Sequence, residues 1–150
     1  MKTSNYRALF FIAALLSFPL ASFAEPGTRI NISLDEPARA FVLKEMRGLL
    51  LGLQQMTAAL ASDDMETVAK AAKPLGMQMM RNVPKSLMQK LPKEFRKLGS
   101  SVHRDFDMIA QDAQDLEDSQ HTLTQLSATL AKCVACHAIY QITAESNESR

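Results

Sequence analysis

The chain is poor in several residue types on which common binding functions depend. It has no tryptophan, its aromatic residues make up only 6% of the total, and its formal net charge is +1 over 150 residues. Aromatic platforms for carbohydrates and aromatic cages for cations therefore have little to be built from. A near-neutral charge also gives no indication of nucleic-acid binding, which depends on a clearly basic surface.

Cysteines and long apolar runs are scarce as well. There are two cysteines, and the one pronounced apolar run, residues 8–16, follows Lys2 and Arg7 near the N-terminus. A short apolar run after basic residues, followed by small residues such as Ser22 and Ala24 at positions −3 and −1, is typical of a secretory signal peptide. The run is shorter than the ~20 residues that span a bilayer. We therefore expect cleavage after Ala24 and export, with no membrane span in the mature chain.

The predicted mature chain covers residues 25–150 and has 126 residues (150 − 24). This length suits one domain with a hydrophobic core. Removal of the predicted signal peptide, residues 1–24, lowers Lys+Arg from 17 to 15 and leaves Asp+Glu at 16, so the net charge changes from +1 to −1. We expect no nucleic-acid partner for such a nearly neutral domain.

The two cysteines lie close together in residues 133–137, which read CVACH. The pattern C-x-x-C-H is typical of c-type haem attachment. In that chemistry Cys133 and Cys136 form thioethers with the two haem vinyl groups, and His137 becomes the proximal iron ligand. The motif thus predicts one covalently bound haem c.

Three other uses of a C-x-x-C pair fit the chain less well. A redox dithiol belongs near a βαβ pattern, and the sequence has no strand-rich region. A structural zinc site needs a second ligand pair, whereas His103 and His121 are single residues. A disulfide across one helical turn is disfavoured, because Cβ atoms three residues apart lie about 5–6 Å from each other and a disulfide needs about 3.8 Å.

The mature chain is predicted to be helical throughout, after an extended arm over residues 25–34. Apolar residues recur at intervals of three and four, which indicates amphipathic helices. The four helices are expected over residues 35–61, 64–82, 92–116 and 119–144. Their predicted buried faces comprise Leu43, Met46, Leu50, Leu53 and Leu60; Met65, Val68, Ala72, Leu75 and Met79; Phe95, Leu98, Val102, Phe106, Ile109, Ala113 and Leu116; and Leu123, Leu126, Leu130, Cys133, His137 and Tyr140.

Local signals refine these boundaries. Asp35 is a plausible N-cap of the first helix, with Pro37 in its first turn. Pro74 and Gly76 should kink or split the second helix. The segment 84–92 is expected to be a linker with about one helical turn. Four amphipathic helices with short connections predict an all-α fold, an antiparallel up-down four-helix bundle with the haem near the C-terminal helix.

A haem motif on the last of four helices resembles the class II c-type cytochromes, which include the cytochromes c-prime and their low-spin relatives. The resemblance is specific only at Cys133, Cys136 and His137. It implies a periplasmic electron-transfer protein that is not an enzyme and that exchanges electrons with periplasmic donor and acceptor proteins. It also implies that a homodimer through the first two helices could form. The family often has a basic residue between its cysteines, where this chain has Val134 and Ala135.

The sixth iron position separates two functions within that family. In low-spin members a methionine from the first helix binds the iron, and Met46 is the matching candidate for a distal ligand. In c-prime members an apolar residue stands there and the iron binds nitric oxide or carbon monoxide, which is the alternative function. Those members tend to have an arginine one turn earlier, where this chain has Val42. The alternative role of Met46 is to fill the core, a common use of methionine.

Other residues are candidates for the haem surroundings. His103 competes with Met46 as a distal ligand, or is a half-exposed histidine without a role at the iron. His121 is predicted to lie about 24 Å along the fourth helix from His137, too far to bind the same iron. Arg39 and Arg47 on the first helix are candidate partners of the haem propionates, or solvated surface charges.

Overall fold

The computed structural model describes residues 29–145. The predicted signal peptide and its cleavage after Ala24 lie outside the described residues. The described chain is mostly helical, as the sequence predicts, and its elements are β1 (Ile30–Leu34), α1 (Glu36–Leu60), α2 (Met65–Ala72), the 3-10 helix η1 (Lys73–Leu75), α3 (Met77–Met80), α4 (Lys85–Lys90), α5 (Lys93–Asp115), α6 (Ser119–Ile139) and β2 (Tyr140–Ala144).

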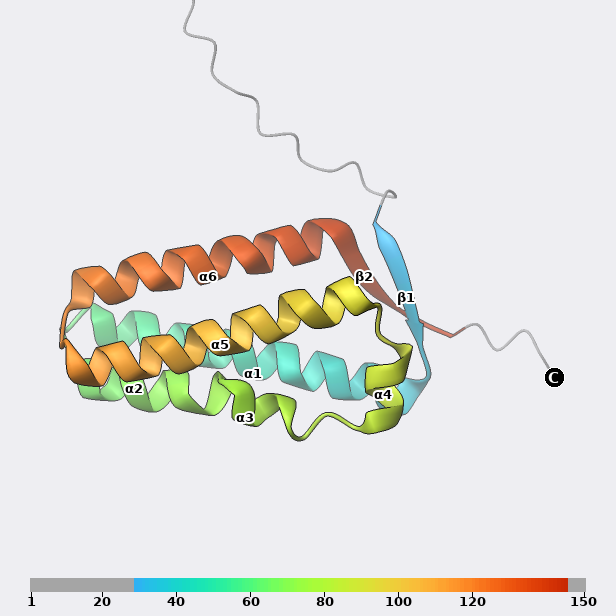
Figure 1. Ribbon diagram of the computed structural model, residues 1–150, viewed down its shortest axis with the longest axis horizontal. Helices are drawn as coiled ribbons and strands as arrows, with labels where there is room; N and C mark the ends of the chain where they lie inside the picture. Colours follow the sequence, from blue (N-terminus) through green and yellow to red (C-terminus); the bar gives the residue numbers. More distant parts are fainter. Residues whose placement is uncertain (1–28, 146–150) are drawn as a thin grey trace, which may run out of the picture.

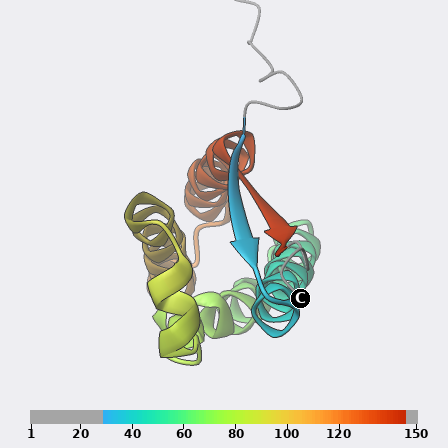
Figure 2. The same cartoon turned by 90° about the vertical axis from the view of Figure 1, so that its right-hand side faces the viewer.

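The long helices lie lengthwise beside one another, and the chain reverses direction from each to the next (Figure 1). α1 packs against α2, α2 against α5, and α5 against α6. Viewed from the end in Figure 2, the helices surround a central region, and the two strands run across that end from α6 towards α1.

Side-chain caps begin several of these helices. The Asp35 carboxylate accepts a hydrogen bond of 2.9 Å from the Ala38 amide, and a proline occupies the first turn of α1. Asp64 and Asp118 cap α2 and α6 in the same way, each through a 2.9 Å bond. Each cap satisfies an amide that has no partner within its helix. The predicted cap at Asp35 is confirmed.

The second predicted helix is split, as Pro74 and Gly76 indicate. It divides into α2, η1 and α3, with Gly76 between the last two. A side chain at Gly76 would collide with the Asp107 carboxylate, which accepts a 3.0 Å hydrogen bond from the Met77 amide. The absence of a side chain at Gly76 therefore lets the Asp107 carboxylate of α5 approach the first amide of α3.

The last helix ends earlier than the sequence predicts. The sequence predicts helix to residue 144, but α6 ends at Ile139 and residues 140–144 form β2. β2 pairs in parallel with β1, with Ile30 opposite Tyr140 and Leu34 opposite Ala144. Strand-favouring residues such as Ile142 and Thr143, and the partner strand, outweigh continuation of the helix.

Two of the predicted buried faces are confirmed only in part, because some of their members pack against the hydrophobic clusters and others are exposed. In α1, Leu50 is 67% exposed, while Val42, Gly52, Met56 and Ala59 are buried. A side chain at Gly52 would overlap Leu75, so the small residue lets α1 and η1 approach closely. The inward side of α1 therefore combines a glycine at this close approach with large residues such as Met56.

In α6, Leu123 and Leu130 are exposed, while Thr122, Leu126 and Thr129 are buried. The Thr129 hydroxyl donates to the Gln125 carbonyl at 2.9 Å, so this buried hydroxyl has a hydrogen-bond partner. The side chain of His137 is also exposed and not on the innermost line of the helix.

The faces of the second and third predicted helices are largely confirmed. The buried residues there are Met65, Val68, Ala72, Leu75, Val102, Phe106, Ile109 and Ala113; Leu116 is 55% exposed. Most of them belong to a first hydrophobic cluster that extends from the middle of the molecule towards the α5–α6 turn. A second cluster is formed by Ile32, Leu34, Val42, Leu87 and Leu91 at the end that carries the strands.

Candidate functional site

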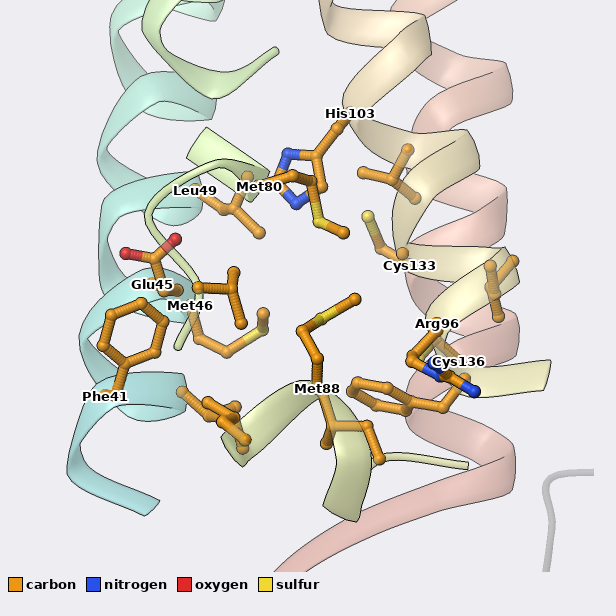
Figure 3. Close-up of a pocket in the computed structure, with 18 of the residues that line it drawn as sticks. Phe41, Glu45, Met46, Leu49, Met80, Met88, Arg96, His103, Cys133 and Cys136 are labelled. Carbon is orange, nitrogen blue, oxygen red and sulfur yellow. The ribbon is translucent and has the colours of Figure 1, made fainter. Parts of the chain in front are cut away.

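A pocket of about 840 Å³ opens between the helices near the second cluster. α1, α3, α4, α5 and α6 all contribute to its walls, and Figure 3 shows side chains from these elements directed into it. Its lining is almost entirely apolar. The 840 Å³ includes the part of the pocket that is open to solvent.

The motif residues from α6 form one wall of this pocket. Cys133 and Cys136 are half-buried, and both lie in the lining (Figure 3). His137 lines the same pocket and also a neighbouring one of about 850 Å³, which Val42, Met46, Phe95 and Cys136 share. The sequence prediction that all three motif side chains address one space is consistent with this arrangement, although His137 is at the rim.

Both thiols are free and neutral in character. Burial raises the pKa of Cys133, and the Asp105 carboxylate raises it further, while a backbone hydrogen bond opposes both. Burial is also the main cause that raises the pKa of Cys136. A reactive redox dithiol needs a lowered pKa, so the surroundings of this pair do not favour that use. Within residues 29–145, no three His, Cys, Asp or Glu side chains gather as ligands for a metal ion.

Three methionine side chains enter the pocket from the elements that face α6. Met46 comes from α1, where the sequence places the candidate distal ligand, and it lines both pockets. Met80 from α3 and Met88 from α4 also line the first pocket, and all three side chains extend into it in Figure 3. The sequence prediction treats 84–92 as a linker, so Met88 is not among its candidates.

His103 lines the pocket from α5. Its Nδ1 lies 2.6 Å from the Leu75 carbonyl oxygen. Because a carbonyl can only accept, Nδ1 donates this hydrogen bond, and Nε2 takes no part in it. The Leu75 hydrogen bond holds the His103 ring towards η1 and does not engage Nε2. His121 does not line the pocket; its Nε2 is 3.1 Å from an Asp112 carboxylate oxygen.

Charged groups in the pocket differ from those the sequence suggests. Arg39 pairs with Glu36 at 3.8 Å, and neither Arg39 nor the exposed Arg47 lines the pockets. Arg96 from α5 lines the first pocket, and its Nε is buried without a hydrogen-bond partner among the described residues. Unpaired buried donors are costly, so Arg96 offers a hydrogen bond to a ligand.

Glu45 is the acidic residue of the pocket wall. Burial raises the pKa of its carboxyl, and the charges of His103 and Lys44 lower it. A carboxyl and an arginine in an otherwise apolar lining give the pocket few polar contacts. Such a lining suits a large apolar ligand with a small number of polar groups.

Comparison with known proteins gives no relative from which to transfer a function. No family model matches the chain, and neither the curated proteins nor the solved structures contain a match. Within the part of the chain that the structure describes, every helix is too short or too polar to cross a membrane.

Proposed function

We propose that the protein is an exported c-type cytochrome that carries electrons with one covalent haem c. The observation that carries the proposal is the position of the C-x-x-C-H motif: Cys133, Cys136 and His137 all line one apolar pocket of about 840 Å³. Haem attachment requires the two thiols and the histidine to face the same bound macrocycle. A chance occurrence of the motif would not need to face any pocket.

The residues present fit this group. Two thiols can form the thioethers, and a histidine directly follows the second of them. The apolar walls suit a porphyrin, and the unpaired Nε of Arg96 would gain a partner from a propionate carboxylate. When bound, haem supplies a one-electron ferric–ferrous couple.

Each side chain has a role in this proposal. Cys133 and Cys136 would hold the cofactor to α6, and His137 would bind its iron. Met46 would supply a second, thioether ligand, and such a ligand raises the reduction potential. The apolar lining excludes water, so the charge change on electron transfer meets a low dielectric environment.

The architecture supports the same proposal. The helices α1, α2 with α3, α5 and α6 run in alternating directions, and this arrangement supports an assignment of the chain as an up-down four-helix bundle of the class II cytochrome type, with the haem near the C-terminal helix. Residues 1–24 are proposed as the signal peptide and the periplasm as the location. The partners are then periplasmic electron donors and acceptors, and the protein catalyses no reaction of its own.

The test is expression with a c-type haem maturation system, followed by ferric and ferrous absorption spectra with and without carbon monoxide. We expect haem that stays on the chain after acid–organic extraction, with a low-spin spectrum that carbon monoxide does not change. A high-spin spectrum that shifts with carbon monoxide would support the alternative, a five-coordinate nitric oxide or carbon monoxide binder. Complete extraction of the haem would refute both.

A further inference from the structure

Two of the three methionines in the pocket belong to the same hydrophobic cluster. Met46 and Met88 both pack against the second cluster, which includes Leu87 and Leu91. Met80 does not pack against it and lies beside His103 at the other end of the pocket in Figure 3. The thioethers of Met46 and Met88 therefore enter the same part of the pocket from two different elements, α1 and α4.

We propose that Met88 is a second distal thioether, which binds the haem iron when Met46 does not. This inference rests on the proposed function, because it assumes haem attached at Cys133 and Cys136. It assigns a role to a residue in a segment that the sequence presents as a linker. The consequence is that the iron keeps six ligands and stays closed to small gases even when one thioether is lost.

The backbone of α4 is held in place at the pocket. Leu87 and Leu91, on either side of Met88, are 3% and 8% exposed. Lys90 Nζ contacts an Asp35 carboxylate oxygen at 2.8 Å and a Glu145 carboxylate oxygen at 3.1 Å, which connects α4 to the start of α1 and the end of β2. The helix that carries Met88 is thus anchored to both chain segments at this end of the molecule.

The side chain of Met88 itself is adaptable. Methionine is unbranched, has three rotatable bonds and can reposition its sulfur without movement of the backbone. In Figure 3 the Met88 side chain rises from α4, at the bottom of the view, into the middle of the pocket between Met46 and the wall that carries Cys133 and Cys136. Thioether sulfur is a known axial ligand of haem iron.

His103 is a weaker candidate for this role. Its Nδ1 is hydrogen-bonded to the Leu75 carbonyl at 2.6 Å, which fixes the ring towards η1. A shift of its Nε2 towards the motif would break that bond. Met88 has no such tether, because a thioether needs no hydrogen-bond partner.

The experiment compares four haem-loaded variants: Met46→Ala, Met88→Ala, Met46→Ala with Met88→Ala, and Met46→Ala with Met80→Ala as the matched control. Ferric spectra report spin state and the charge-transfer band of methionine-ligated iron, and carbon monoxide titration of the ferrous forms reports access to the sixth position. Covalent haem yield and far-UV circular dichroism check that each variant folds.

We expect each single variant and the control pair to stay low-spin with the methionine band. The Met46→Ala, Met88→Ala pair should become high-spin and bind carbon monoxide more tightly than Met46→Ala by about tenfold or more, because no internal ligand competes. A high-spin Met46→Ala, or a high-spin Met88→Ala, would overturn the inference and leave the cytochrome proposal intact. A low-spin double variant would overturn it too. Absence of covalent haem from the wild type would remove both proposals.

Discussion

The two ends of the molecule are packed in different ways. Around the first cluster, Met56, Val68, Phe106 and Ile109 are completely buried, and helices approach closely enough to require glycine at position 52. At the other end, the pocket walls are built from half-buried residues such as Met46 and Met88. One end is a closed core, and the other has room for a ligand and side chains that can adapt to it.

This difference indicates that stability and function are carried by separate regions. The closed end consists of fully buried, closely packed side chains whose replacement should change the free energy of unfolding. The pocket end is held by two strands, by α4 and by the contacts of Lys90. Substitutions at the pocket end should alter the properties of the bound cofactor more than the free energy of unfolding of the helices.

The largest expected effect on stability comes from Phe106→Ala, compared with Phe95→Ala. Phe106 is 0% exposed in the first cluster, so its truncation should cost about 3–5 kcal/mol. Phe95 is half-buried at the pocket, and its ring centroid lies 5.4 Å from that of Tyr140. Truncation of Phe95 should therefore cost roughly half as much free energy of unfolding as truncation of Phe106, or less. Urea unfolding followed by circular dichroism measures both values. Equal costs would contradict the division into two regions.

A smaller effect is expected from Gly52→Ala, with Gly99→Ala as the matched control. The added methyl at Gly52 would overlap Leu75 in the closed region, and such overpacking should destabilise by about 1–3 kcal/mol. At Gly99, on a pocket-lining stretch of α5, nothing lies within 4 Å of the added carbon. There alanine should stabilise the helix by about 0.5–1 kcal/mol. Thermal unfolding would show opposite signs; a stabilised Gly52→Ala would show that the close approach is absent.

How far the sequence predicts this fold differs between helices. The faces of α2 and α5 follow from the spacing of large apolar residues such as Val68 and Phe106. The faces of α1 and α6 follow from it only in part, because Gly52 and Thr129 occupy buried positions that spacing rules assign to the surface. The pairing of β1 with β2 was also missed, since it joins segments about 110 residues apart and only tertiary packing brings them together.

The residues of the candidate site also differ in how far the sequence predicts them. The spacing of Cys133, Cys136 and His137 carries its own chemical meaning, so these residues could be named from the sequence. Met88 and Arg96 could not, because their place in the pocket depends on how residues 84–92 fold back against α1 and α5. No local sequence pattern in residues 84–92 predicts that this segment folds back against α1 and α5.

The smallest expected effect concerns the ion pairs of Lys90. Hydrogen bonding from Lys90, and then from the Ala38 amide, lowers the pKa of Asp35 from its ordinary 3.8. A carboxylate with a lowered pKa contributes stability above its unfolded pKa and loses it as the pH falls through the folded value. Lys90→Gln should therefore be less stable than the wild type at neutral pH, and the difference should vanish as the solution is acidified below about pH 3.8.

The control is Lys97→Gln, which removes an exposed pair with Glu94 within α5 at 3.4 Å. Pairs within one exposed helix contribute little, so this variant should follow the wild type across the pH range. Urea midpoints between neutral and acid pH provide the comparison. A constant difference between Lys90→Gln and the wild type at all pH values would show that Lys90 acts by packing and not by charge.

The most direct measurement is the intact mass of the exported protein, produced with a c-type maturation system and denatured before analysis. We expect a chain without residues 1–24 that carries one haem. Cys133→Ser with Cys136→Ser should carry none, and the exposed-site control Val134→Ser should carry one. A wild-type chain with no added haem, or a double variant that retains it covalently, would contradict the claim that these cysteines attach the cofactor.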